Sequence, residues 1–343
     1  MTRRQLTVVV GAVALLAIAA IASLALGSVR YPVGEVLRVV HWEILPGFLQ
    51  DLIPGTPARP SAAATQIIVD LRVPRTVTAI AVGAALAVSG SLLQGALGNP
   101  LASPDVIGVT AGAGLGGMIA LLIFPNQPEL LPVGALVLGL LAAIVVFVVA
   151  SMGPNGGSVV RLILAGIAIS ALFGAATNAV MNVYPDRVPS AVPFLAGFLA
   201  YEGWDKLGAV APYIGVGLVL ALILIRPLDR LALGDDVAKS LGANPATIRI
   251  WASFAAALLA ASAAALAGLL GFVGLIVPHA VRLLGGSSTH RFVIPTAAIG
   301  GAALVTIGDE VARTVVKGVD LPVGPFMVVI GVPFFLLLLR KAA

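Results

Sequence analysis

The sequence has no cysteine and few charged residues, and each shortage excludes a class of protein. Without cysteine there can be no disulfide, no thiolate metal ligand and no cysteine nucleophile. Charged residues make up only 10% of the 343 residues, whereas an ordinary soluble domain carries roughly 25%. The formal net charge of +5 is small and spread along the chain, so a nucleic-acid-binding surface is not expected.

Motifs for enzyme chemistry are missing as well. Every lysine follows a residue other than glycine, so the chain has no G-x-x-x-x-G-K-[ST] loop to hold nucleotide phosphates. There is no H-E-x-x-H motif, and His41, His279 and His290 lie too far apart in sequence to support a metal cluster. We therefore expect no catalytic residue, no metal site and no cofactor bound by this chain.

What the chain has instead is apolar sequence. Hydrophobic residues make up 59% of it and the mean hydropathy is +1.09, so lipid is the solvent for most of its length. In lipid, backbone polar groups must be satisfied within a helix or a closed barrel. The apolar blocks are continuous and lack the alternating polarity of barrel strands. This pattern predicts an all-α, polytopic membrane protein.

Charges and Pro or Gly clusters divide the apolar sequence into about ten spanning blocks. The region 248–285 is one long run that a single helix cannot accommodate, so we divide it at Gly271. A shorter apolar piece, 191–200, is predicted to be a re-entrant or surface helix. The predicted blocks are 6–27, 74–97, 105–124, 130–151, 161–182, 208–225, 248–270, 272–285, 293–312 and 322–339.

An even number of spans places both termini on one side of the membrane. Basic residues at both ends, Arg3 and Arg4 and then Arg340 and Lys341, indicate that this side is cytoplasmic. The first apolar stretch is long enough for a retained helix rather than a cleaved signal peptide. We thus expect one permease-like domain over 1–343.

Two polar segments interrupt the apolar blocks. The outer segment 28–72 is Pro-rich and is expected to be a loop with one short helix near Val33 to Val40. The cytoplasmic segment 226–248 is expected to form one or two short helices outside the membrane.

The predicted helices carry almost no ionisable residue in their middles, where coupled carriers and pumps bind their ions. His279 is the deepest candidate, and because Pro278 precedes it we interpret the pair as a helix break rather than a proton relay. A transporter with neither an ATP site nor an ion site must draw its energy from another polypeptide.

Four motifs then make the prediction specific. They are RVPRTVTAIAVGAALAVSGSLLQGALGNPLASPDVIGVTAGAGLGG (72–117), LGDDVAKSLGANP (233–245), GFVGLIVPHAVRLL (271–284) and LPVGPFMVVIGVPFFLLLLRK (321–341). In this order and spacing they resemble the FecCD-type permeases of ABC importers. That family, whose members have the type II importer architecture, carries iron–siderophore complexes, haem and vitamin B12 across the bacterial inner membrane.

The resemblance implies a set of partners. These are a second permease copy in a homodimer, two cytoplasmic ATPases that bind ATP and Mg, and an extracytoplasmic substrate-binding protein. In the family, acidic residues of the binding protein are received by arginines at the positions of Arg72, Arg75 and Arg313. Docking would explain why the outer side holds many arginines, although interfacial anchoring by long side chains is the simpler alternative.

The resemblance also implies a contact with the ATPase. The segment 233–242 would enter a groove on that subunit and couple its closure to the permease, unless it is only a solvated connector. The coupling residues are Leu233, Gly234, Asp235, Asp236, Lys239, Ser240, Leu241 and Gly242.

For the pathway, the family places a cytoplasmic gate before the fifth block, at Ser158, Val159 and Val160. Valines there indicate closure by dewetting, or merely packing at the bilayer boundary. Gly166, Asn178 and Asn182 are expected to face the pathway. The glycines Gly112, Gly114, Gly116 and Gly117 are expected to permit close helix packing rather than to bind phosphate.

Two departures from the family are notable. The outer loop 41–66 is long and Pro-rich, and Phe194 and Phe198 stand where the family often has Trp and a small residue. The cargo is expected to be a ferric siderophore, with haem or vitamin B12 as alternatives. An ion-coupled carrier and an intramembrane enzyme are the competing classes, disfavoured by the uncharged helix middles and by the lack of a paired nucleophile and base.

Overall fold

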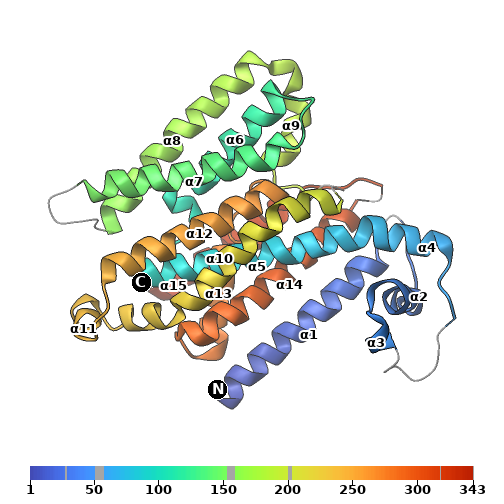
Figure 1. Ribbon diagram of the computed structural model, residues 1–343, viewed down its shortest axis with the longest axis horizontal. Helices are drawn as coiled ribbons and strands as arrows, with labels where there is room; N and C mark the ends of the chain where they lie inside the picture. Colours follow the sequence, from blue (N-terminus) through green and yellow to red (C-terminus); the bar gives the residue numbers. More distant parts are fainter. Residues whose placement is uncertain (28, 51–57, 153–158, 200–202, 317, 343) are drawn as a thin grey trace.

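The computed structural model describes the chain except residues 28, 51–57, 153–158, 200–202, 317 and 343. Within the described part it consists of helices and connecting segments (Figure 1). Seven helical segments are long and apolar enough to span a membrane, and three shorter apolar helices accompany them. Together these confirm the ten predicted blocks.

The spanning helices follow the predicted order. They are α1 (Arg3–Ala25), α5 (Val73–Leu97), α6 (Val109–Ile123), α7 (Leu130–Ser151), α8 (Val159–Val183), α10 (Trp204–Leu231), α12 (Pro245–Ala267), α13 (Val273–Gly285), α14 (His290–Thr314) and α15 (Gly324–Ala342).

Helix ends follow local chemistry. Thr2 and Gln5 form a capping box at the start of α1, and the Asn244 side chain accepts from the N–H groups of Ala246 and Thr247 at the start of α12. Gly98 ends α5 with a left-handed φ of 59°. These devices set where the chain leaves each helix.

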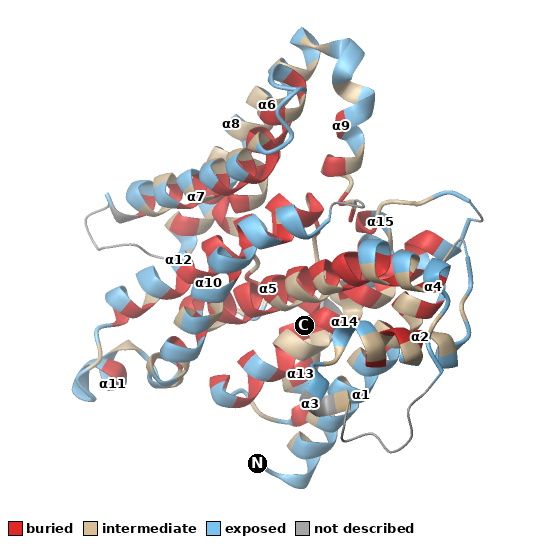
Figure 2. Ribbon diagram, turned by 45° about the vertical axis from the view of Figure 1, so that its right-hand side comes forward, coloured by how far each residue is buried: buried red, intermediate tan, exposed pale blue. Residues whose placement is uncertain are grey.

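Helix α5 lies at the centre of the bundle, against α12, α14, α10 and α13 (Figures 1 and 2). It is buried along most of its length, whereas α1 and α8 leave apolar side chains exposed. Helices α6, α7, α8 and the short α9 (Val188–Leu195) form a group on one side of it (Figure 1). The exposed apolar faces suit lipid or a protein partner.

Close helix crossings rest on glycine. A Cβ on Gly90 of α5 would lie 1.8 Å from the carbonyl oxygen of Gly274 on α13, and one on Gly116 of α6 would lie 2.0 Å from that of Gly134 on α7. Any side chain larger than hydrogen would force these helices apart. A Cβ on Gly112 would likewise lie 2.3 Å from the carbonyl oxygen of Leu138 on α7. The packing role predicted for Gly112 and Gly116 is thus confirmed.

The region 248–285 is divided into two helices, as predicted, but the residues that turn the chain are neighbours of Gly271 rather than Gly271 itself. The chain turns between α12 and α13, where Gly268 and Phe272 both have positive φ, of 69° and 67°. Pro278 lies inside α13, so the interpretation of Pro278–His279 as a helix break is wrong. The imidazole of His279 instead packs edge-on against Phe334 of α15, 6.2 Å between ring centroids.

Three non-helical segments meet at this turn and satisfy one another's backbone. The N–H of Leu269 donates to the carbonyl of Phe194 at the end of α9, at 3.1 Å. The carbonyl of Gly197 accepts from Val323 and Gly324 at the start of α15, at 2.8 and 3.2 Å. Irregular backbone inside a membrane is tolerated where protein groups pair it in this way. Short helix α9 overlaps the apolar piece 191–200, which was predicted to be a re-entrant or surface helix.

The outer segment is more ordered than a loop, which corrects our expectation for 28–72. It holds α2 (Val33–Val39), η1 (Val40–Ile44), α3 (Gly47–Gln50), α4 (Ala62–Gln66) and η2 (Ile67–Arg72). Val36 and Val39 of α2 and Ile68 of η2 belong to a small hydrophobic core within this segment. The N–H of Ser61 donates to Glu35 at 2.8 Å and, as the main cause, holds the pKa of that carboxyl below its usual range.

Candidate functional site

The end of the bundle at which α5 begins contains a buried cluster of charges around Arg75. Its Nη2 donates to Oδ1 of Asp309 at 2.8 Å, and its Nη1 donates to Oδ2 of Asp320 at 2.8 Å. The Phe198 ring lies below the guanidinium, 5.9 Å from its carbon. Arg75 is only 1% exposed, so two carboxylates and a ring enclose it almost completely.

Arg313, one turn along α14 from Asp309, completes the cluster. Its Nη2 donates to Oγ of Ser23 on α1 at 2.9 Å and to the carboxylate of Glu310. Its Nε lies 3.3 Å from Oδ2 of Asp309. Asp309 thus holds Arg75 and Arg313 together and links α5 to α14.

Arg72 lies at the same end of the molecule and closes the end of α1. Its Nη1 donates to the carbonyl of Leu24 at 2.6 Å, and its Nη2 donates to that of Val29. The aromatic ring of Tyr31 lies 5.4 Å from the guanidinium carbon. Carbonyl groups at a helix end favour a cation, so Arg72 acts here as a cap.

The three arginines predicted to receive the binding protein are thus engaged within the fold. Arg72, Arg75 and Arg313 are 4%, 1% and 6% exposed. Asp309, Glu310 and Asp320 pair with Arg75 and Arg313 within the fold, and Arg72 binds backbone carbonyls. The pairing of Arg75 with Asp309 could not be predicted from the sequence, since the two residues are 234 positions apart.

Helix α11 (Asp235–Ser240) lies outside the bundle, at the end opposite α2 and α4 (Figure 1). Gly234 and Gly242 bracket it with φ of 100° and 75°. Ala238 packs inward and is buried, while Leu233, Val237 and Leu241 are 60%, 46% and 52% exposed. Val237 lies in α11, whereas Leu233 and Leu241 flank it on either side. Exposed apolar side chains on and beside a short helix are suited to a protein contact.

Asp235 fixes α11 to the bundle. Its two oxygens accept from Nη1 and Nη2 of Arg249 on α12, at 2.9 and 2.7 Å. These hydrogen bonds are the main cause that holds the pKa of Asp235 below its usual range. Nε of Arg249 also donates to the carbonyl of Ala96 at the end of α5, at 3.1 Å. Arg249 therefore connects α11, α12 and α5.

The other residues of the predicted coupling segment are more loosely held. Lys239 lies 3.4 Å from Asp236, but both side chains are well exposed, so this pair adds little stability. The Ser240 hydroxyl donates to the carbonyl of Val237 at 2.8 Å and ends the helix.

The predicted pathway residues divide into separate groups. Asn178 and Asn182 are exposed on α8, with Nδ2 of Asn182 donating to the Asn178 carbonyl at 2.9 Å. Val160 is 65% exposed at the start of α8. Ser158 lies outside the described residues, and so does the side chain of Val159.

Gly166 does not face a pathway, which corrects our expectation. It is buried, and a Cβ there would lie 1.8 Å from the carbonyl oxygen of Val106. Val106 belongs to η3 (Pro104–Ile107), a short turn that follows α5 and precedes α6. Gly166 is therefore the point at which α8 packs on the connection between α5 and α6.

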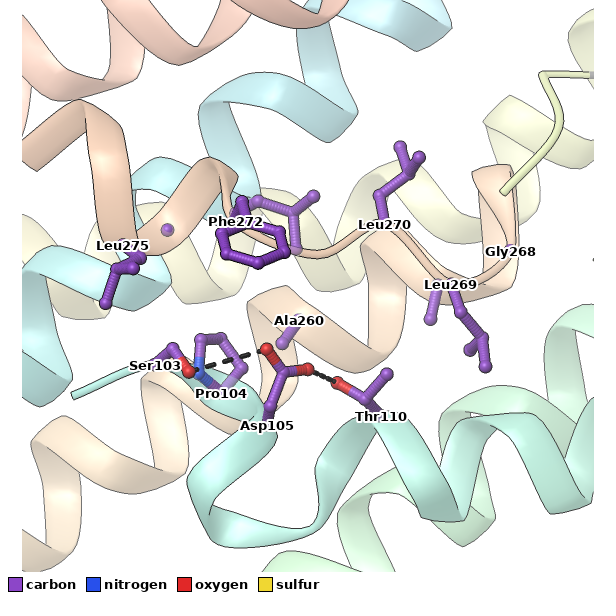
Figure 3. A pocket seen from close by; sticks show the side chains of 13 residues that line it. Ser103, Pro104, Asp105, Thr110, Ala260, Gly268, Leu269, Leu270, Phe272 and Leu275 are labelled. Carbon is purple, nitrogen blue, oxygen red and sulfur yellow. Dashed lines mark hydrogen bonds between the residues drawn. The ribbon is translucent and has the colours of Figure 1, made fainter. Parts of the chain in front are cut away.

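Sequence reasoning missed Asp105 in that same connection. Its carboxylate accepts from the hydroxyls of Ser103, at 3.4 Å, and Thr110, at 2.5 Å. Figure 3 shows it beside a small cavity of about 20 Å³ next to the turn at Gly268 and Phe272. A cavity of that size holds about one water. The Ser-Pro-Asp sequence at the edge of an apolar block was the available signal.

Phe194, one of the two departures from the family, packs inside the bundle. Its ring lies against Gly117 of α6, where a Cβ would come within 2.2 Å, and it is 8% exposed. It anchors α9 to α6.

Comparison with known proteins identifies the group to which this arrangement belongs. Residues 15–341 match the FecCD transport family. The Fe(3+)-citrate import system permease protein YfmE of Bacillus subtilis (strain 168) is 37% identical over 281 residues, which are 81% of this chain and 83% of that protein. The hemin transport system permease protein HmuU of Yersinia pestis is also 37% identical, over 80% of this chain and 83% of its own length.

Solved structures agree with this match. An inward-facing ABC transporter structure, described as being of the metal-chelate type, superposes with a TM-score of 0.82 at 30% identity. The superposition covers 98% of this chain and 99% of that one. PsaBC from Streptococcus pneumoniae shares the fold at a TM-score of 0.56 and 21% identity.

Proposed function

The chain belongs to the FecCD transport family and is the membrane-spanning permease subunit of an ABC importer; we propose that its cargo is a ferric chelate, brought into the cytoplasm. The observation that carries this assignment is the 37% identity, over about four fifths of both chains, with a permease named for ferric citrate import. Haem is the second candidate, because the hemin permease is equally similar.

Energy for transport comes from partner chains in this proposal. Two cytoplasmic ATPases bind ATP and Mg, and each contacts α11 of one permease copy. The exposed side chains of Leu233, Val237 and Leu241 supply the apolar contact area. The Asp235–Arg249 pair then passes the motion of α11 to α12 and α5.

The permease acts as a homodimer, with the pathway between the two copies. Support comes from α8, whose Leu164, Ile167 and Leu172 are each 60% exposed and form an apolar face outside the bundle. The polar Asn178 and Asn182 lie on the same helix. Val160, at the start of α8, forms part of the cytoplasmic gate.

An extracytoplasmic binding protein docks at the outer ends of α5 and α14. For Arg72, Arg75 and Arg313 to receive its acidic residues, docking must open the buried cluster and replace internal carboxylates with those of the partner. Asp320 is the accessible member, at 29% side-chain exposure, and is the first carboxylate that a partner displaces.

The experiment is uptake into proteoliposomes that contain the permease with its ATPase, in the presence of the binding protein. We expect uptake of iron from ferric citrate to require ATP and to persist when the membrane potential is collapsed. Uptake that follows the potential instead would mean an ion-coupled carrier. Uptake of haemin with no uptake of ferric citrate would assign the second cargo.

A further inference from the structure

Beside α11 the cytoplasmic ends of six helices surround a crevice of about 470 Å³. The end of α5, the junction of α10 and α11, and the starts of α12 and α14 form its walls, and α13 contributes Arg282. The crevice is separate from the exposed apolar side chains of Leu233, Val237 and Leu241 and from the pathway residues of α8.

The charged groups that line this crevice differ in whether they have a partner of opposite charge. Arg249 is paired with Asp235, and the N–H and Nδ1 of His290 lie 2.7 and 2.8 Å from Oδ1 of Asp229. Arg282 is half-buried, and among the described residues its guanidinium makes one hydrogen bond, to an amide oxygen, and no ion pair. One positive charge of the crevice thus lacks a counter-charge.

Arg282 is also connected to the interior. Its Nη1 donates to Oε1 of Gln94 at 2.5 Å. The same amide donates through Nε2 to the carbonyls of Gly274, at 3.1 Å, and Ala102, at 3.3 Å. Gln94, on α5, therefore connects Arg282 with the start of α13 and with the connection between α5 and α6, on which Gly166 of α8 packs.

We propose that this crevice receives an acidic side chain of the ATPase subunit, whose carboxylate pairs with Arg282 and forms a second coupling contact beside α11. The proposal rests on the proposed function, because it is the contact of α11 with the ATPase that brings such a side chain to the crevice. An arginine fork binds a carboxylate through two parallel N–H donors, and Arg282 has donors to spare. A carboxylate that moves Arg282 also moves Gln94, and with it the connection between α5 and α6 on which α8 packs.

The test measures the affinity of the nanodisc-embedded permease for the isolated ATPase at several salt concentrations. We expect Arg282→Glu to weaken binding of the ATPase about tenfold or more and to reduce the salt dependence of that binding. Arg282→Lys should keep most of the affinity. Arg291→Glu is the matched control, since Arg291 is an exposed arginine at the same membrane side outside the crevice, and it should change affinity less than about threefold. Wild-type affinity for Arg282→Glu would overturn the proposal.

Rescue identifies the occupant. One acidic-to-arginine substitution on the ATPase surface should restore binding to Arg282→Glu and to no other permease variant. If no such substitution restores it, the carboxylate is not the occupant. If inorganic phosphate at matched ionic strength abolishes the difference between Arg282→Glu and wild type, or if the difference needs anionic lipid in the nanodisc, the crevice holds a phosphate group and the proposal fails.

Two further variants separate this proposal from the proposed function. Val237→Asp on α11 should abolish ATPase binding whether or not the crevice is used. Loss of binding with Val237→Asp but not with Arg282→Glu overturns the crevice alone, and binding by both variants overturns the coupling role of α11 as well. Where Arg282→Glu does not elute as a folded protein, Arg282→Gln removes the charge without reversing it and gives the same comparison.

Discussion

Asp235 and Arg249 form a bidentate ion pair that joins α11, a short helix outside the bundle, to α12 inside it. The two hydrogen bonds, of 2.7 and 2.9 Å, use both oxygens and both terminal nitrogens. Because Arg249 also donates to the Ala96 carbonyl, the pair is supported from a third helix. A rigid joint of this kind is what a mechanical coupling between subunits requires.

Breaking this joint should uncouple the importer without unfolding it. We expect Asp235→Ala and Arg249→Ala each to reduce transport per ATP hydrolysed, because α11 then moves without moving α12. The exchanged pair Asp235→Arg with Arg249→Asp should recover part of the loss, and a double-mutant cycle measures that recovery. Asp236→Ala is the control, because Asp236 is 98% exposed at its side chain and should be neutral. Equal coupling ratios in all variants would contradict the role of the pair.

The joint should depend on pH in one direction only. The pKa of Asp235 lies below its unfolded value of about 3.9, chiefly because Arg249 donates to it. Its contribution is therefore complete above the unfolded pKa and is lost as pH falls through the lower, folded pKa. Hydrogen exchange of the α11 amides, corrected for intrinsic rates, should show constant protection from about pH 8 to pH 5 and a loss below about pH 4 in the wild type. Asp235→Asn should lack this acid transition.

The buried pair of Arg75 and Asp309 should matter far more for stability. Removing one partner leaves an uncompensated buried charge, and we expect Asp309→Ala to lower the free energy of unfolding by about 3–5 kcal/mol. Arg38→Ala removes only the exposed partner of the Arg38–Glu35 pair, at 42% side-chain exposure, and should cost about 1 kcal/mol or less. Thermal unfolding in detergent compares the two. Similar losses would show that the cluster is open to water in the membrane-embedded protein.

Asp320 offers a test of how docking uses this cluster. If the binding protein competes for Arg75, Asp320→Asn removes one internal competitor and should raise the affinity for the binding protein by about threefold or more at low salt. Asp309 still holds the arginine in this variant, so the fold is kept. An unchanged or lower affinity would mean that the binding protein does not reach Arg75.

Helix crossings at glycine give a prediction about packing alone. A methyl group on Gly90 meets the Gly274 carbonyl at 1.8 Å, so Gly90→Ala should destabilise the protein by about 1–3 kcal/mol. Gly11 on α1 has nothing within 4 Å of an added Cβ, and Gly11→Ala should be neutral or stabilising by up to about 1 kcal/mol. Thermal unfolding should therefore shift in one variant and not in the other. Equal shifts would mean that α5 and α13 are farther apart in the bilayer.

The sequence predicted the spanning helices well because lipid leaves the backbone few alternatives. The block expected at 130–151 is α7, Leu130–Ser151, and the block at 272–285 is α13, Val273–Gly285. Continuous apolar sequence is a local signal, and each helix satisfies its own backbone whatever its neighbours are. The motifs in turn located α11, since a short amphipathic helix between two glycines is also encoded locally.

What the sequence could not reveal depends on contacts between distant residues. The outer segment 28–72 folds because a few apolar side chains, among them Val36 and Ile68, meet across it. Arg75 and Asp309 pair across most of the chain, so an arginine that seemed available to a partner is already bound. Gly166 was expected to face the pathway because only its position on α8 was known, not the backbone of Val106 beside it. Tertiary contacts decide each of these cases.

The absence of cysteine makes the orientation of the chain directly measurable. Any single cysteine introduced is the only thiol, so a membrane-impermeant maleimide reports which side it faces without background. Lys239→Cys on α11 and Asn126→Cys between α6 and α7 both replace exposed residues, at opposite ends of the bundle. With both termini cytoplasmic, Asn126→Cys should react in intact cells stripped of their outer barrier, and Lys239→Cys only after the membrane is opened. The reverse pattern would place α11 outside, where no ATPase can reach it, and would remove both the coupling proposal and the crevice proposal together.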